Sequence, residues 1–441
     1  LEVNGLYDGS SKFAKDHRYA FFPSVSAAWR ISEENFWQPL KGWWNDMKIR
    51  GSYGSLGNQV MDDLGNFPYL ATYGTNSSYN YLINGSKPVI VKAPGLVAPD
   101  FTWETVTQMD FGFDASFLNN RLTGTFDWYR RNTKDMLVAG ATLPATLGAS
   151  VPKSNSADMK TIGWELSLGW NDRLENGFSY WVKGVLSDYQ ATITKYAGND
   201  AGFYSQSDGD GKYYVGQKIG EIWGYHSNGL FQSDDEAATI DQSELYAGKW
   251  GAGDVKYEDL DNDGKITKGE ETIYNPGDKS IIGNKTPRYQ FGITVGFDYK
   301  NFDFEMFWQG TGKRDYMLSG AQFWGFTSQW DVPYTPALDY WTETNTDAYF
   351  PRPGWQNGGN RVTSDRYLQS AAYGRLKNLT VGYTIPKNLT TKWGISRLRL
   401  YVTGENLLTI TPLNDAFDPE TLGGMTYPIN RKVAIGLNLT L

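Results

Sequence analysis

Val433-Ala-Ile-Gly-Leu-Asn-Leu-Thr-Leu441, near the C-terminal end, alternates apolar residues with small or polar ones without a break. A period of two places the apolar side chains on one face of a β-strand and the remaining side chains on the other. The same alternation recurs in residues 289–299, 302–308 and 122–128. These segments are therefore predicted to be strands whose two faces meet different surroundings.

The joins between the predicted strands alternate in length. About twelve strands are expected, at residues 2–8, 21–31, 46–56, 103–118, 121–137, 161–172, 177–195, 288–300, 302–315, 371–385, 397–410 and 431–441. The even-numbered joins are short, such as 119–120, whereas most odd-numbered joins are long, such as 57–102 and 196–287. Short turns at one end and long loops at the other are typical of an outer-membrane barrel, which satisfies every backbone polar group in lipid. The sequence therefore predicts an all-β fold, a transmembrane antiparallel β-barrel with long extracellular loops.

Composition agrees with a barrel. The mean hydropathy is −0.50 and 15% of the residues are aromatic. No apolar run reaches the roughly 18 residues that a membrane helix needs, but barrel strands are only half apolar. A net charge of −8 argues against a nucleic-acid partner, which calls for a basic surface. The chain contains no cysteine, which fits an oxidising compartment.

Enzyme chemistry has little material in this chain. His17 and His226 are its two histidines, so neither a histidine-based triad nor a multi-histidine metal site is expected. Asp234 and Asp235 could in principle serve glycoside hydrolysis. They lie in residues 232–240, however, which are predicted to form a short helix with an N-terminal cap. We therefore expect no enzyme activity.

Several blocks of sequence resemble the barrel of SusC/RagA-type TonB-dependent transporters, in the order found in that family and over essentially the whole chain. The blocks include Phe21-Phe-Pro-Ser-Val-Ser-Ala-Ala-Trp-Arg-Ile31, Lys48-Ile-Arg-Gly-Ser-Tyr-Gly-Ser-Leu-Gly-Asn58, Gly216-Gln-Lys-Ile-Gly-Glu-Ile-Trp-Gly-Tyr225, Ile282-Gly-Asn-Lys-Thr-Pro287, Arg375-Leu-Lys-Asn-Leu-Thr-Val-Gly-Tyr-Thr-Ile-Pro386 and Gly404-Glu-Asn-Leu407. The resemblance implies that residues 1–441 supply about the last 12 strands of a 22-stranded barrel. The plug domain and the early strands of that barrel are then expected in an N-terminal segment of the same transporter.

The resemblance also implies a function and partners. The expected protein is an integral, lipid-embedded protein of the outer membrane of a Gram-negative, Bacteroidetes-type bacterium. It would import nutrients, either glycans and oligosaccharides or peptides. A SusD-like surface lipoprotein would cover its extracellular mouth, and TonB–ExbB–ExbD would energise it through the N-terminal segment. Two alternatives stay open: a complete, smaller passive porin, and a soluble calcium-dependent carbohydrate-binding β-protein.

The longest predicted extracellular loop, residues 198–287, contains a candidate calcium site. In residues 259–270, Asp259, Asp261, Asp263 and Glu270 occupy positions 1, 3, 5 and 12 of an EF-hand calcium loop, Gly264 position 6, and the Lys265 carbonyl position 7. Carboxylates this close repel one another unless a cation neutralises them. We therefore expect a structural Ca²⁺ without flanking EF-hand helices. The alternative is a solvated acidic turn.

Aromatic residues of the two longest predicted extracellular loops are candidate substrate contacts. Aromatic rings with polar neighbours suit sugars or peptides at the mouth of a pore. Trp223 and Tyr225 come from the first loop, and Trp324 and Trp330 from the second. The alternative is that these rings pack the loops against each other or against a partner.

Overall fold

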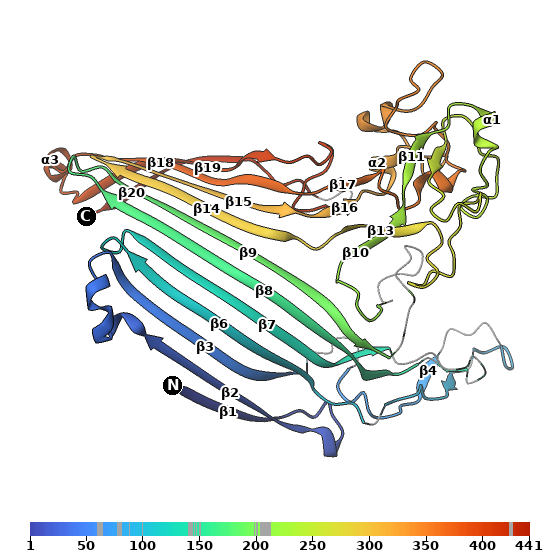
Figure 1. Ribbon diagram of the computed structural model, residues 1–441, viewed down its shortest axis with the longest axis horizontal. Coiled ribbons are helices and arrows are strands. Elements are labelled where there is room, and N and C mark those ends of the chain that lie inside the picture. The colour runs from blue at the N-terminus through green and yellow to red at the C-terminus, as the bar shows by residue number, and fades with distance from the viewer. Residues whose placement is uncertain are drawn as a thin grey trace.

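The computed structural model covers the whole chain (Figure 1). It describes all residues except 60–64, 77–81, 88, 99, 140–143, 145, 147, 150, 198, 200–201, 203–212 and 423–426. The start of the predicted 198–287 loop therefore lies largely outside the described residues.

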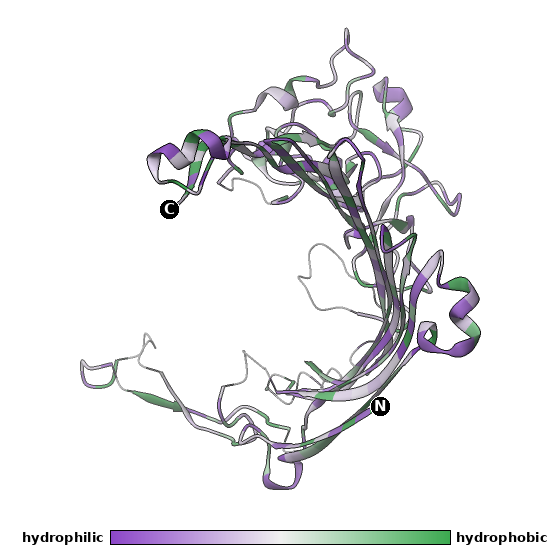
Figure 2. Cartoon of the chain, turned by 90° about the vertical axis from the view of Figure 1, so that its left-hand side faces the viewer, coloured by the Kyte–Doolittle hydropathy of each residue, from purple (hydrophilic) through white to green (hydrophobic). Residues whose placement is uncertain are grey.

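Twelve strands form one antiparallel sheet, which confirms the predicted all-β fold. In sheet order they are β1 (Glu2–Gly9), β2 (Tyr19–Arg30), β3 (Trp44–Asn58), β6 (Glu104–Phe117), β7 (Leu122–Ala139), β8 (Lys153–Arg173), β9 (Ser179–Tyr196), β14 (Arg288–Tyr299), β15 (Phe302–Lys313), β18 (Tyr373–Thr384), β19 (Arg397–Ile410) and β20 (Lys432–Thr440). Each strand pairs with the next long strand along the chain, as in a barrel wall. Seen end-on, the sheet curves into an open arc (Figure 2) whose edge strands are β1 and β20.

The two faces of the sheet differ as the alternation predicts. On the convex face, Phe111 of β6 stacks on Trp128 of β7, with ring centroids 6.4 Å apart. On the concave face, Arg50 of β3 is hydrogen-bonded to Asp114 of β6 and Asp127 of β7. The convex face is therefore the lipid-facing surface and the concave face lines the lumen.

The short joins gather at one end of the strands and the long joins at the other (Figure 1). Asn119 and Asn120, in the turn between β6 and β7, have φ values of 60° and 64°. This left-handed region tolerates asparagine better than most residues. Two other short joins contain small helices: η2 (Ile31–Glu33) and η3 (Asn35–Leu40), and α3 (Lys387–Thr390) and η7 (Thr391–Trp393).

The long joins carry their own small elements. These are η1 (Lys15–His17), β4 (Gly74–Asn76), β5 (Ile90–Lys92), β10 (Glu221–Tyr225), β11 (Ser227–Leu230), α1 (Asp234–Ala237), β12 (Val255–Tyr257), β13 (Lys279–Asn284), β16 (Asp315–Met317), α2 (Ala321–Trp324), η5 (Thr335–Leu338), η6 (Gly358–Arg361) and β17 (Leu368–Ser370). The predicted cap of α1 is present, because Ser233 accepts a hydrogen bond from the Glu236 N–H. Across the described residues, every helix is too short or too polar to span a bilayer.

The predicted bounds are wrong where β7 and β8 meet the long joins. The join expected at 138–160 is shorter, because β7 runs to Ala139 and β8 starts at Lys153. The pairing of the two strands is irregular between Thr133 and Met136. A bulge shifts the alternation by a residue while the ladder continues, so the period-two pattern ends before the strand does.

Candidate functional site at the loop end of the sheet

Three long joins share one hydrophobic core at the loop end. We call residues 213–287, 314–372 and 411–422 the cap. Its buried core consists of Tyr225, Leu230, Val255, Tyr257, Ile266, Leu318, Phe323, Phe350, Tyr367, Ala371, Leu413, Phe417 and Leu422. Phe323 of the second join lies 6.2 Å from Phe417 of the third, between ring centroids. The cap is therefore a packed body with its own interior, which distinguishes it from a set of independent loops.

A buried carboxylate joins the first two segments of the cap. Asp254 is 1% exposed and accepts hydrogen bonds from Arg352 Nε at 3.0 Å and Nη2 at 2.7 Å. Asn360 Nδ2 and the Gly251 N–H donate to the same carboxylate. A buried charge needs such partners, because an unpaired one is strongly unfavourable. Asp254 therefore fixes how the first two joins sit against each other.

His226 forms a second link between the first two segments of the cap, which the sequence did not predict. Its Nδ1 lies 2.7 Å from Asp365 Oδ2 and its Nε2 lies 2.7 Å from Ser280 Oγ. Ser280 belongs to β13 and pairs with Gly224 of β10. The imidazole therefore links β13 to the second segment of the cap. The sequence contains two histidines and predicts no triad, yet a hydroxyl and a carboxylate from distant segments contact the ring of His226.

The calcium motif brings only part of its predicted ligand set together. Carboxylate oxygens of Asp259, Asp261 and Asp278 lie within 4.8 Å of one another. Asp263 is turned toward its own backbone, where it accepts the Lys265 N–H at 2.8 Å. Glu270 is exposed and is not part of this group of carboxylates. Asp278, beyond the twelve-residue motif, is instead the third acid.

The environment of these acids would suit a hard cation. Asp278 is fully buried and accepts the N–H groups of Leu260 at 2.7 Å and Thr267 at 2.6 Å. Lost hydration and the charges of Asp263, Asp278 and Asp259 raise the pKa of Asp261. Carboxylate oxygens in a close group are the ligands that Ca²⁺ prefers. The three carboxylates are therefore of the ligand type that calcium prefers. The bound Ca²⁺ and its predicted ligands stay a prediction.

The four predicted substrate-contacting aromatics differ in their placement. Tyr225 is 3% exposed and belongs to the cap core, and its OH lies 3.4 Å from the Thr267 carbonyl. Trp324 is half-buried against the same core. Trp223 is half-buried, with its ring 6.4 Å from that of Tyr214. Trp330 is 84% exposed, so among the four it has the most surface to offer a ligand or partner.

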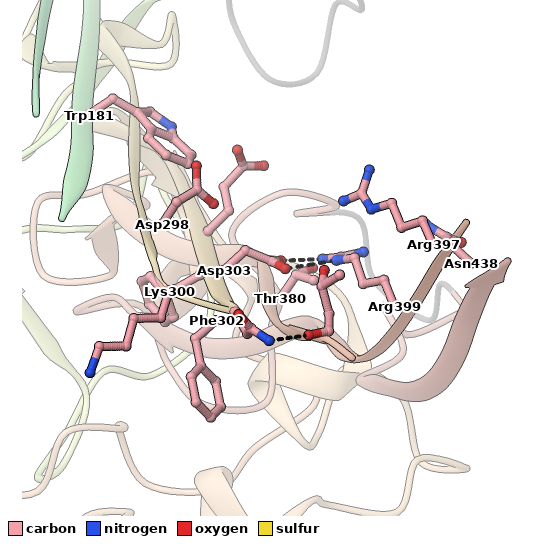
Figure 3. A pocket seen from close by; sticks show the side chains of 13 residues that line it. Trp181, Asp298, Lys300, Phe302, Asp303, Thr380, Arg397, Arg399 and Asn438 are labelled. Carbon is pink, nitrogen blue, oxygen red and sulfur yellow. Dashed lines mark hydrogen bonds and ion pairs between the residues drawn. The ribbon is translucent and has the colours of Figure 1, made fainter. Parts of the chain in front are cut away.

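The lumen wall carries a polar groove of about 670 Å³ near the short turns. Asp303 of β15 and Arg399 of β19 face each other across β18 (Figure 3), with Arg399 Nε 2.9 Å from Asp303 Oδ1. Gly382 of β18 lies beneath this ion pair, where a Cβ would collide with both side chains. The Arg399 guanidinium also stacks on Tyr401, 4.9 Å from the ring centroid. No sequence motif indicates this ion pair, because the register of β15, β18 and β19 brings the two residues together.

A curved sheet with an apolar outer face, a polar inner face and a packed cap at one end defines an outer-membrane barrel receptor. The family described as "TonB dependent receptor-like, beta-barrel" matches residues 1–407. The chain belongs to this family of TonB-dependent receptors and is an outer-membrane protein of the SusC/RagA-like type.

Named relatives agree with this assignment. TonB-dependent receptor P3 of Formosa agariphila is 30% identical across 98% of this chain and 43% of its own length. TonB-dependent receptor SusC of Bacteroides thetaiotaomicron is 28% identical across 98% of this chain and 41% of its own length. The solved structure of the RagAB peptide transporter is 22% identical, has a TM-score of 0.76, and is matched over 97% of this chain and 44% of its own. The chain thus spans less than half the length of these proteins.

Proposed function

We propose that this chain forms part of an outer-membrane importer of nutrients, either glycans and oligosaccharides or peptides. A SusD-like surface lipoprotein would close the mouth at the cap. TonB–ExbB–ExbD would energise opening through segments outside residues 1–441. The observation that carries the proposal is the packed cap on a curved sheet with a polar lumen wall. Such a cap offers a fixed rim on which a lid can seat.

The two alternatives are less consistent with this sheet. A complete passive porin requires the sheet to close on itself, yet β1 and β20 lie at opposite ends of the strand order in the described structure. A soluble protein would hide its apolar face, but Ile435 and Leu437 on β20 are 84% and 61% exposed. Exposed apolar side chains in such a band favour lipid.

Energised import can be tested with the full-length receptor in its own outer membrane. Cells receive a labelled oligosaccharide mixture or a labelled peptide mixture, with and without an uncoupler of the proton gradient. We expect one of the mixtures to enter only when the receptor and the gradient are both present. Uptake that needs the receptor but ignores the uncoupler would instead identify a passive pore.

The lid is tested separately, by mild-detergent purification of the receptor from the same cells. We expect a surface lipoprotein to copurify with the wild type. Its binding should weaken in the Trp330→Ala variant and persist in the matched Trp393→Ala variant. Trp393 is also well exposed, at 65%, but lies in a short join at the opposite end. Absence of any copurifying lipoprotein would contradict the proposed partner.

A further inference from the structure

Four cations lie in a row on the lipid-facing side of the sheet. Arg130 and Lys134 belong to β7, Lys160 belongs to β8, and Lys218 lies in the segment that pairs with the outer end of β9. Strands β7, β8 and β9 lie side by side in the middle of the sheet (Figure 1). We call these four residues the basic row. The proposed import function does not account for these four residues.

Strand register places the basic row on the convex face. Arg130 follows Trp128 by two positions on β7, and Trp128 stacks on Phe111 on that face. Asn132, between Arg130 and Lys134, pairs with Lys160. Lys160 pairs in turn with Thr192 of β9, and Thr192 pairs with Lys218. Directly paired residues share a face, so the row crosses three neighbouring strands on the lipid side.

The height of the row matches the outer membrane–water boundary. On β8, the convex face runs from Trp170, near the short turn, through Leu168, Leu166, Trp164 and Ile162 to Lys160. These roughly ten residues are what a tilted strand needs to cross a bilayer. Ile162, just below Lys160, is still 40% exposed and apolar. Lys160 therefore lies where the apolar band ends, on the side of the long joins, and Arg130 pairs with Ile162 at the last apolar position of that band.

In the part of the chain that the structure describes, no carboxylate neutralises the charges of the basic row. None of its four side chains forms an ion pair there, and Arg130 Nε reaches only the Asn132 amide oxygen, at 3.3 Å. The neighbouring carboxylates have other partners. Asp158 accepts the Asp135 N–H, Asp188 binds Arg288, and Glu221 accepts the Lys218 N–H and the Tyr214 hydroxyl.

We propose that the basic row binds the phosphate groups of a phosphorylated glycolipid in the outer leaflet. Cations at the edge of an apolar band meet the head-group layer, where a lipid phosphate offers several acceptor oxygens at once. Its acyl chains would lie along the apolar face formed by Ile162 and Trp128. Neighbouring strands are about 4.8 Å apart, so cations on adjacent strands can share one phosphate or contact two on the same sugar backbone.

The test uses the full-length receptor, purified in a mild non-ionic detergent. The variant Arg130→Gln/Lys134→Gln/Lys160→Gln/Lys218→Gln removes the row. Its matched control, Lys41→Gln/Lys300→Gln/Lys387→Gln/Lys392→Gln, removes four cations at the opposite end of the strands. Native mass spectrometry counts phosphoglycolipid per receptor, and delipidated receptor is then titrated with monophosphoryl lipid A. We expect at least a fivefold loss of bound lipid and of affinity in the first variant, and wild-type values in the control.

Three results would overturn the proposal: equal lipid retention in both variants, equal binding of lipid A that lacks phosphate, or displacement of the lipid by inorganic phosphate at equal concentration. The last would identify a free-anion site instead of a lipid site. If the fourfold variant fails to assemble, Lys160→Gln/Lys218→Gln is compared with Lys160→Arg/Lys218→Arg. We then expect a loss of about threefold for the first pair and none for the second. Equal lipid counts in these two variants would also count against the lipid site.

Discussion

Asp254 and Arg352 lie 98 residues apart in the chain, yet the guanidinium of Arg352 donates two hydrogen bonds, of 3.0 and 2.7 Å, to the Asp254 carboxylate. The carboxylate is almost completely buried, whereas the arginine side chain is 41% exposed. The same oxygens also accept hydrogen bonds from the Asn360 side-chain amide and the Gly251 N–H. One carboxylate thus organises two of the three joins that build the cap.

The first prediction follows from this pair. Asp254→Ala leaves Arg352, Asn360 and the Gly251 N–H without their acceptor, so the cap should lose about 3 kcal/mol of local stability. Hydrogen exchange in the full-length receptor should show faster opening of the cap, with β14 and β15 unchanged. Asp234→Ala is the control, because Asp234 pairs with Lys249 at an exposed position and its loss should change little. Equal protection in both variants would mean that Asp254 does not hold the cap together.

The second prediction concerns the two faces of the sheet. Leu437→Arg or Ile293→Arg places a charge on the lipid-facing surface, at a cost of about 2–4 kcal/mol near the midplane of the bilayer. Asn438→Arg and Thr294→Arg, one position further along, place it in the lumen. Assembly in the outer membrane, measured by heat-modifiable gel mobility, should fall for the first pair and stay near wild type for the second. The assignment of faces fails if both pairs assemble equally poorly.

The third prediction concerns the orientation of the sheet. Protease added to intact cells should cut only in the long joins, for example near the exposed Trp330 or within residues 140–152. The turns at Asn119 and Asn301 should resist, because the barrel topology places short turns on the periplasmic side. Permeabilised cells provide the control in which both turns become accessible. Reproducible external cleavage at either turn would reverse the orientation.

The fourth prediction separates two ligand sets for calcium. If the carboxylates brought together in the structure bind Ca²⁺, Asp261→Asn and Asp278→Asn should each lower affinity at least tenfold. Glu270→Gln should have little effect, because Glu270 is not among them. Calcium titration of the full-length receptor by calorimetry gives these affinities. If Glu270→Gln alone had a strong effect, the ligands would be those of the predicted twelve-residue motif. If no form of the receptor bound calcium, the segment would be a solvated acidic turn.

The pH dependence of the same site has a defined sign. The pKa of Asp261 is raised, so protons compete with Ca²⁺ at that carboxylate over a higher pH range than at an ordinary aspartate. Calcium affinity should therefore fall as the pH drops through that raised pKa. Without calcium the sign reverses, because ionising Asp261 is disfavoured in the folded cap, which should lose stability as the pH rises through the same pKa. Protease resistance of the cap, measured against pH with and without chelator, checks both directions.

The sequence predicted the twelve long strands because their pattern is local. In β20, Ile435 and Leu437 alternate with Gly436 and Asn438, so the two faces of the strand can be assigned without knowledge of any distant contact. The short elements of the cap carry no such pattern. Val255 and Tyr257 are buried because residues of other joins surround them, and that information lies about a hundred positions away.

The candidate site was predictable only in its local part. The spacing of Asp259 and Asp261 predicted them as ligands. Asp278 joins them because the backbone at Gly277 lies close to Gly269, a contact that no sequence motif indicates. The Pro276-Gly277-Asp278 turn was the available signal. The sequence made Tyr225 a candidate substrate contact because it lies in the longest predicted extracellular loop. Its burial depends on Tyr257 and on the second join, which periodicity cannot reveal.

The shared core of the cap has a consequence for the order in which the protein matures. Phe323 and Phe417 stand on either side of β18 and β19 in the chain, and the pairing of those two strands brings their joins to the same end of the sheet. Contacts of such long separation form late, because the closure of the intervening segments must come first. A sheet paired out of register would hold the two rings apart and leave the cap open to proteases. Closure of the cap is therefore expected to depend on correct pairing of the wall beneath it.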